Sequence, residues 1–245
     1  MKQNIYDDSK FFNEYQTMRE SNINDNELIE IPTMKKMLPN LKDKTILDLG
    51  CGAGYMSRYF VENGASKVVA CDISQNMIDL ASKEDCKNID YKVLPMEDIS
   101  SINEKFDIVF SSLAFHYIKD FDKLISDISK LLKPNGMLVF SQENPVATAI
   151  IHPQTKQKYV EIDEKRYYLL SDYNNVGKRI IDWCDSEVIK YHRNFETIVN
   201  TLIKNNFEIK EIKEPSANED AIKLMPKLKY QNDRPYFLFV KAIKK

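Results

Sequence analysis

The sequence predicts an α/β fold built around a mostly parallel sheet. Short apolar runs alternate with helical patterns between residues 45 and 142, and turn residues separate them. Strands that alternate with helices of this length are typical of βαβ units. Three of the six glycines lie within residues 50–54, in a turn after the first apolar run. Open α/β sheets bind ligands at the carboxyl ends of their strands, so this turn is a candidate binding site.

Within this core, the apolar runs predict five strands and the segments between them predict helices. The helix after the first strand should begin near Tyr55 and end at Asn63-Gly64, where glycine can adopt the left-handed conformation. Ser74 is expected to cap the second helix. Apolar positions 121, 124, 125, 128, 131 and 132 predict a third helix, and KPNG then predicts a turn. The expected strands are TILDL (45–49), KVVAC (67–71), DYKVL (90–94), FDIVFS (106–111) and MLVFS (137–141).

The whole chain, residues 1–245, is interpreted as one domain with three segments around the core of residues 45–142. Residues 1–44 form an N-terminal helical segment, in which Pro32 is expected to interrupt the helices. Residues 143–192 are rich in tyrosine and charge, and are interpreted as an insertion with short strands of its own. In residues 193–245, Asn194 should cap a last helix, and FEIKEIKE and YFLFVKAI should pair as a closing hairpin.

Composition narrows the class of protein. The net charge of −2 lacks the basic character of a nucleic-acid-binding surface. The four cysteines show no CxxC or metal-ligand spacing, so we expect reduced thiols and no metal site. No stretch resembles a signal peptide or reaches 18 consecutive apolar residues. These features predict a cytoplasmic protein that binds neither nucleic acid nor membranes.

The glycine turn has the spacing GxGxG and follows Asp48. Gly50 permits a tight turn, and Gly52 lets a ligand approach the backbone closely. A dinucleotide fingerprint would need a glycine where Tyr55 stands, and no GK[ST] follows to make a P-loop. Asp72 ends the second strand, where a carboxylate can accept both hydroxyls of a ribose. Alternatively, Asp72 only begins an Asx turn before the Ser74 cap.

Taken together, ILDLGCGAGYMSRYF and VVACDISQNMIDLA resemble the class I S-adenosylmethionine (SAM)-dependent methyltransferases, in particular the small-molecule branch called methyltransferase type 11. The resemblance covers residues 45–142. It implies a Rossmann-like, seven-stranded, mostly parallel sheet with an antiparallel last strand and helices on both faces. It also implies SAM as the cofactor and S-adenosylhomocysteine (SAH) as the product.

The resemblance also implies roles for residues of the turn and of the first two strands. Asp48 would organise the turn and reach the methionine ammonium of the cofactor. Asp72 would bind the ribose hydroxyls, and Ile73 would cover one face of the adenine. The backbone that would lie against the methionine and ribose portions belongs to Gly50, Cys51 and Gly52.

Further carried-over roles concern more distant parts of the chain. Ser111 would contact the methionine moiety by its backbone carbonyl. Tyr15 and Arg19 resemble an N-terminal helix that closes over the cofactor, with Arg19 near its carboxylate; alternatively, Arg19 is an exposed helical arginine. The acidic residue that many members use for the adenine amino group is displaced here. Either Glu97 takes that role through a shifted loop, or the backbone of Met96 holds the adenine.

Methyl transfer from a sulfonium depends mainly on alignment, so the absence of an obvious triad does not exclude catalysis. His116 either acts as a general base or orients the substrate, or else it caps a turn or packs beneath the loop. Tyr117 is a candidate pocket wall. In YHRN, His192 is a candidate base and Arg193 a candidate clamp for a substrate anion, unless they form an ordinary polar strand end. Trp183 and the tyrosines of the insertion form either an aromatic wall or the insertion's own core.

The expected activity is transfer of a methyl group to an oxygen or nitrogen atom of a small molecule. Signatures of DNA base methylation are missing, because SSLA follows the fourth strand in place of [DN]PPY and the Pro-Cys nucleophile is absent. The alternative is a regulatory or scaffold protein that binds SAM or SAH without transfer. The protein is expected to be a monomer or a homodimer.

Overall fold

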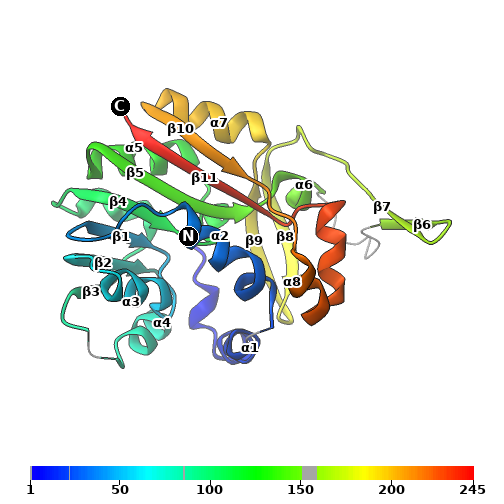
Figure 1. Ribbon diagram of the computed structural model, residues 1–245, viewed down its shortest axis with the longest axis horizontal. Coiled ribbons are helices and arrows are strands. Elements are labelled where there is room, and N and C mark those ends of the chain that lie inside the picture. Colours follow the sequence, from blue (N-terminus) through cyan, green and yellow to red (C-terminus); the bar gives the residue numbers. More distant parts are fainter. Residues whose placement is uncertain (1, 22, 85, 151–158) are drawn as a thin grey trace.

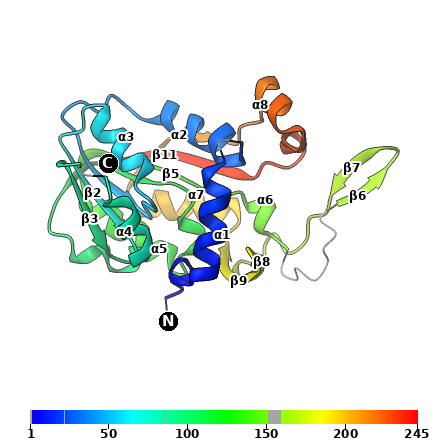
Figure 2. The ribbon, with the colours of Figure 1, turned by 90° about the horizontal axis from the view of Figure 1, so that it is seen from below.

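The computed structural model describes residues 2–21, 23–84, 86–150 and 159–245. A seven-stranded sheet forms its centre, with helices on both faces (Figures 1 and 2). Of these described strands, only β11 runs in the opposite direction to the others: it pairs antiparallel with both β10 and β5, whereas the remaining pairs are parallel. The Rossmann-like sheet with an antiparallel last strand is therefore confirmed. Across the sheet, the strands are β10 (Phe207–Lys213), β11 (Phe237–Lys244), β5 (Leu132–Glu143), β4 (Phe106–Ser111), β1 (Thr45–Leu49), β2 (Lys67–Asp72) and β3 (Ile89–Val93).

Two apolar cores lie on opposite faces of this sheet, because successive side chains of a strand alternate between its faces. Leu47 and Val69 belong to the core that α5 and α7 cover. Ile46 and Val68 belong to the core under α2 and α3. Both faces are buried, which explains the near-continuous apolar runs of the central strands. The core helices are α3 (Tyr55–Glu62), α4 (Gln75–Ala81), η3 (Met96–Ser101), η4 (Phe115–Tyr117), α5 (Phe121–Leu131) and α7 (Phe195–Lys204).

The predicted helix ends are found in the structure. The Ser74 hydroxyl accepts a hydrogen bond from the Met77 amide, and the Asn194 side chain caps α7 through Thr197. Gly64 follows the end of α3 with φ of +93°. The turn before the fifth strand is continuous with β5, and Asn135 takes φ of +59° within it. Within the described residues, no helix is both long and apolar enough to cross a bilayer.

The N-terminal helices differ from expectation at Pro32. The segment contains η1 (Ile5–Asp7), α1 (Ser9–Glu20), the π-helical η2 (Asn26–Glu30) and α2 (Ile31–Met37). The expected interruption at Pro32 is wrong, because the helix runs from η2 straight into α2. Proline has no N–H to donate, and it is tolerated here because it lies in the first turn of α2, directly after the π-helical turn.

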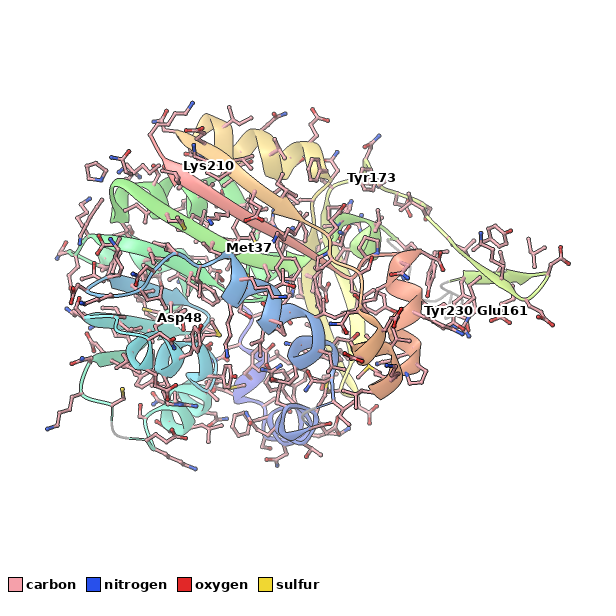
Figure 3. All side chains as sticks on the ribbon, viewed as in Figure 1. Met37, Asp48, Glu161, Tyr173, Lys210 and Tyr230 are labelled. Atoms are coloured by element: carbon pink, nitrogen blue, oxygen red, sulfur yellow. The ribbon has the colours of Figure 1, made fainter. Side chains whose placement is uncertain are left out.

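Two antiparallel hairpins follow the core, separated from it by the short helix α6 (Pro145–Thr148). The first, β6 (Tyr159–Ile162) with β7 (Lys165–Tyr168), projects away from the sheet (Figures 1 and 2). Arg166 holds it near η5 (Pro226–Asn232), because its guanidinium lies over the rings of Tyr159 and Tyr230 at 4.2 and 4.0 Å. Figure 3 shows Tyr230 beside this hairpin.

The second hairpin, β8 (Gly177–Trp183) with β9 (Ser186–His192), packs against the N-terminal helices. The Trp183 ring lies 5.4 Å from the Phe11 ring and 5.9 Å from the Tyr15 ring, both edge to face. Helix α8 (Glu219–Leu224), which precedes η5 and the closing strand, contributes to the core under α2. The expected hairpin of β10 and β11 is confirmed as an antiparallel pair.

Candidate functional site

A cavity of about 310 Å³ opens at the carboxyl ends of β1, β2 and β4. The N-terminal helices and the β8–β9 hairpin close its other sides. Most of the residues predicted for the site line it. They are Tyr15, Arg19, Asp48, Gly50, Cys51, Gly52, Asp72, Ile73, Met96, Glu97, His116 and Tyr117.

The glycine turn forms one wall of the cavity. Gly50 and Cys51 donate backbone hydrogen bonds of 2.8 and 3.0 Å to the Cys71 carbonyl, which folds the turn against β2. Gly50 and Gly52 both have positive φ, of +70° and +52°. A Cβ at Gly50 would lie 2.6 Å from the Ala114 Cβ, whereas a Cβ at Gly52 would meet nothing within 4 Å. Gly50 is therefore required by packing, and the backbone of Gly52 borders open space that a ligand can fill.

Asp72 connects the glycine turn to the start of α4. Its carboxylate accepts one hydrogen bond from the Gly52 amide and one from the Ser74 amide, each of 2.9 Å. Burial raises the pKa of Asp72, although these backbone hydrogen bonds oppose the shift. The hydrogen bond from the Ser74 amide forms the Asx turn that was the alternative role of Asp72 in the sequence analysis. Asp72 also lines the cavity. A carboxylate has about four acceptor sites, so Asp72 can still accept hydroxyl groups.

Asp48 is a nearly buried carboxyl group, 1% exposed, between the end of β1 and α3 (Figure 3). Ser57 of α3 donates a 2.6 Å hydrogen bond to it. Burial raises the pKa of Asp48 to about 7, despite this hydrogen bond. Because ionisation of Asp48 is unfavourable in this setting, a cation that enters the cavity would stabilise the charged form.

Arg19 places a cation at another wall of the cavity. Its Nη2 lies 3.7 Å from Glu27 Oε1, whereas its Nη1 is buried and has no hydrogen-bond partner among the described residues. Arginine donors match carboxylates well. The alternative of an ordinary exposed helical arginine is therefore wrong, and Arg19 is suited to an anionic group of a ligand.

The N-terminal segment is held by hydrogen bonds near the carboxyl ends of the sheet strands. Asp7 accepts hydrogen bonds from the Ser74 hydroxyl at 2.6 Å and from the Asn76 amide at 3.1 Å, at the start of α4. The Tyr6 ring lies 5.1 Å from the Tyr15 ring, edge to face. These contacts hold an aromatic cover over the cavity.

His116 lines the cavity but is only 3% exposed. Its Nδ1 accepts a 3.4 Å hydrogen bond from the Glu143 amide, and its ring lies 4.3 Å from the Tyr117 ring. Burial lowers the pKa of His116 to about 3, so the imidazole is neutral at neutral pH. Of the alternatives left open, His116 is both packed beneath the loop and in contact with the cavity.

His192 and Arg193 do not line the cavity, so the expectation that they face the cleft is wrong. His192 is held between the Thr148 hydroxyl, 2.8 Å from Nδ1, and the Tyr173 carbonyl, 2.9 Å from Nε2. Arg193 is buried over the Phe121 ring and donates to the carbonyls of Phe115, in η4, and of Ile118, directly after it. Both lie at the end of β9, beyond the part of the strand that borders the cavity.

Ser111 is also displaced from its expected role. It is fully buried, and its hydroxyl donates a 2.8 Å hydrogen bond to the Leu49 carbonyl. The wall is formed by Ser112 and Leu113 instead, one and two residues further on. The expected contact through Ser111 is therefore wrong by at least one residue, because the chain enters the cavity only after the strand has ended.

A buried carboxyl group supports this wall from behind. Leu113 has φ of +50°, a conformation that costs about 1–2 kcal/mol for a residue with a Cβ. Its amide donates to the Ser141 hydroxyl at 3.0 Å, and Ser141 donates in turn to Glu30 at 2.5 Å. Burial raises the pKa of Glu30. The hydrogen bonds from Ser141 and Ser112 compensate the burial of Glu30 and fix the strained turn.

Sequence reasoning missed Lys190 and Glu143, which form an ion pair at the cavity. The Lys190 side chain is only 5% exposed. Trp183 lines the same region, whereas the tyrosines of the insertion (Tyr159, Tyr167, Tyr168 and Tyr173) do not. Lys190 could have been found from the alternation of side chains along β9, because Val188 and Lys190 lie two residues apart and occupy the same inward face of the strand. Across the described ranges, no cluster of His, Cys, Asp and Glu is arranged to hold a metal ion.

Comparisons with known proteins agree with this arrangement. The sequence pattern described as "Methyltransferase domain" matches residues 47–140. A SAM-dependent methyltransferase from Mesorhizobium loti has a similar structure, with a TM-score of 0.80, 32% identity, and coverage of 88% of this chain and 97% of that one. An uncharacterized protein of Haemophilus influenzae is 39% identical over 99% of this chain and 98% of its own. A ubiquinone biosynthesis O-methyltransferase from Coxiella burnetii is 31% identical over 49% of this chain and 52% of its own.

Proposed function

The chain belongs to the SAM-dependent methyltransferase family, and we propose that its methyl acceptor is a small molecule, methylated on oxygen or nitrogen. The chain is an enzyme, and SAM is its cofactor. The observation that carries the proposal is the continuity of one cavity from the glycine turn to the walls made by η4 and the β8–β9 hairpin. Such a cavity can hold a second ligand beside the cofactor.

The residues at the glycine turn fit SAM. We propose that Asp72 accepts hydrogen bonds from the ribose hydroxyls and that Asp48 faces the ammonium group. The free N–H groups of Arg19 would donate hydrogen bonds to the carboxylate of the cofactor. The open space against Gly52 accommodates the body of the ligand. When bound, SAM supplies a methyl group on a sulfonium, which is already activated for transfer.

The adenine end has two proposed contacts, because Met96 and Glu97 both line the cavity. We propose that Ile73, which also lines the cavity, covers one face of the base. Cys51 belongs to the same wall, and burial raises the pKa of its thiol well above the ordinary value. We therefore assign Cys51 a packing role there, because the thiolate is the reactive form of cysteine.

The contribution of the protein to the reaction is mainly alignment and exclusion of water. Holding two reactants in the productive geometry can contribute about 7–11 kcal/mol. Tyr6, Tyr15 and Trp183 form an aromatic cover that limits the access of water to the cavity. A regulatory protein without transfer activity would have no use for acceptor space beside the cofactor site. The O-methyltransferase relative supports an oxygen acceptor.

The proposal is tested by incubating the protein with SAM and a library of small metabolites, and measuring SAH release and methylated products by mass spectrometry. We expect a methylated small molecule from the wild-type protein and none from Asp72→Ala. An Asp182→Ala variant, on the exposed side of β8, is the matched control and should keep the activity. Transfer to protein or nucleic acid alone, with no product from the library, would contradict the proposal.

A further inference from the structure

The cavity has a polar end that the proposed cofactor contacts do not use. We call it the acceptor end and define it by His116, Tyr117, Glu143, Trp183 and Lys190, which all line the cavity. Lys190, which is almost wholly buried, and Glu143, which is partly buried, form an ion pair there, and the histidine is neutral. The hydrogen-bonding capacity of these groups limits the chemistry of the molecule that can bind there.

The hydrogen bond at Nδ1 determines which nitrogen of His116 carries the proton. The Glu143 amide can only donate, so Nδ1 must be the acceptor. A neutral imidazole has one N–H, and it is therefore on Nε2. Within the described residues, the hydrogen bond of the His116 ring is the one at Nδ1. His116 consequently presents a hydrogen-bond donor to a ligand and has no free lone pair to act as a general base.

Lys190 presents a second donor at the same end. Its ammonium pairs with Glu143 and lies 5.0 Å from the centre of the Trp183 ring and 5.8 Å from that of Tyr117. An ammonium has three N–H groups, and a single contact with Glu143 leaves donors for a ligand. Because the side chain is almost wholly buried, a ligand acceptor would meet it with little screening by water.

We infer that the methyl acceptor binds as an oxyanion, such as a carboxylate or a phenolate, that receives hydrogen bonds from Lys190 and from His116 Nε2. This inference rests on the proposed function and specifies the class of its substrate. The aromatic rings of Tyr117 and Trp183 flank this position and favour a planar acceptor. A protonated amine needs hydrogen-bond acceptors, whereas Lys190 and His116 Nε2 both present donors at this end.

An acceptor that binds as an oxyanion needs no general base. The acceptor oxygen arrives deprotonated, and one of its lone pairs forms the new bond to the methyl carbon. The bond between that carbon and sulfur breaks, and its electron pair remains on sulfur. The sulfonium charge and the oxyanion charge neutralise each other, so no proton has to leave the acceptor.

The tautomer is tested by NMR on protein labelled with ¹⁵N at histidine, with a His116→Gln variant to assign the signal. We expect the spectrum of the neutral Nε2–H tautomer from pH 5 to pH 8, with and without SAH. A signal that shows protonation of His116 near pH 6.5, or a proton on Nδ1, would overturn the donor assignment. This readout does not depend on activity.

The acceptor class is tested by calorimetry on SAH-saturated protein with three matched probes: benzoate, benzamide and benzylamine. We expect benzoate to bind at least tenfold more tightly than the other two. Lys190→Met should weaken benzoate binding about 10- to 100-fold, as expected for loss of a hydrogen bond to a charged group, and leave benzamide unchanged. Lys178→Met, at an exposed position of the neighbouring β8, is the matched control.

Two further measurements separate the possible failures. Lys190→Met leaves Glu143 without this partner, so Lys190→Met combined with Glu143→Gln should show the same loss of benzoate binding with a restored midpoint of unfolding. Undiminished SAH binding with a preference for benzylamine or benzamide would overturn the oxyanion inference alone. Failure of the wild-type protein to bind SAH would overturn the assignment of the cofactor contacts instead.

Discussion

Replacement of Asp48 by asparagine should stabilise the protein at alkaline pH. Burial raises the pKa of Asp48 from 3.8 to about 7, and each pKa unit corresponds to 1.36 kcal/mol. Ionisation of Asp48 therefore lowers the free energy of unfolding by about 4 kcal/mol above pH 7. Asparagine keeps an oxygen that can accept the hydrogen bond from Ser57 and carries no charge.

The direction in which stability changes with pH follows from the number of protons bound by the folded and the unfolded protein. Between pH 3.8 and about 7 the folded protein holds a proton on Asp48 that the unfolded chain has lost. Stability therefore falls as pH rises through this window. From pH 5 to pH 8, the wild-type protein should lose about 3 kcal/mol of stability that Asp48→Asn retains, as measured by urea unfolding without cofactor.

Asp107 provides the opposite control. Burial acts to raise the pKa of Asp107, but hydrogen bonds from Lys133 and Thr45 lower this pKa to about 2. Asp107→Asn should therefore lose stability at pH 8, whereas Asp48→Asn gains it. For Asp48→Asn we also expect at least about tenfold weaker SAH binding, because this variant lacks the charge that we propose faces the ammonium group of the cofactor. An Asp48→Asn protein that is less stable than wild type at pH 8, or that has the same pH slope, would refute the reasoning.

Four other substitutions separate binding from stability. Asp72→Ala should weaken SAH binding about 100-fold in calorimetry, since it removes acceptors for two charged hydrogen bonds; an unchanged Kd would exclude the ribose contact. Gly50→Ala should unfold at a lower urea concentration than Gly52→Ala, because only the Cβ at Gly50 meets Ala114, whereas Gly52→Ala should lose more SAH affinity. Equal affinities of the two variants would count against a ligand beside Gly52. His192→Gln should lower the free energy of unfolding by about 1–2 kcal/mol and leave turnover unchanged, because its ring joins Thr148 to Tyr173 away from the cavity; reduced turnover of the folded variant would reinstate a catalytic role.

The sequence predicted that the glycine turn and Asp72 lie together at one edge of the sheet, and they line the cavity there, because the signals for this arrangement are local. The spacing from Asp48 through Gly50 and Gly52 requires a specific backbone turn, and the strand that follows carries Asp72 to the same edge of the sheet. Caps such as Ser74 are likewise determined within a few residues. These features need only strand periodicity and turn chemistry to be recognised.

His116, Tyr117 and Trp183 were candidates from the sequence, but the ion pair of Lys190 with Glu143 could not be predicted, because it depends on contacts between segments far apart in the chain. Lys190 meets Glu143 across 47 residues, and Trp183 meets Phe11 across most of the chain. No local pattern distinguishes Lys190, which borders the cavity, from His192, which lies two residues beyond it on the same strand. The end of β4 at Ser111 was predicted, but the residue at which the following loop meets the cavity was not, because that loop is held by hydrogen bonds to Ser141 and Glu30, which lie far away in the chain.

The position of Trp183 gives the protein a built-in optical probe. It is the only tryptophan of the chain, and it lies between the N-terminal aromatic residues and the ammonium of Lys190. Indole emission responds to nearby charge and to the loss of surrounding water, so both the occupation of the acceptor end and the movement of α1 would alter its intensity and colour. Stopped-flow fluorescence can therefore follow the order and rate of ligand arrival in the unmodified protein, with no label attached.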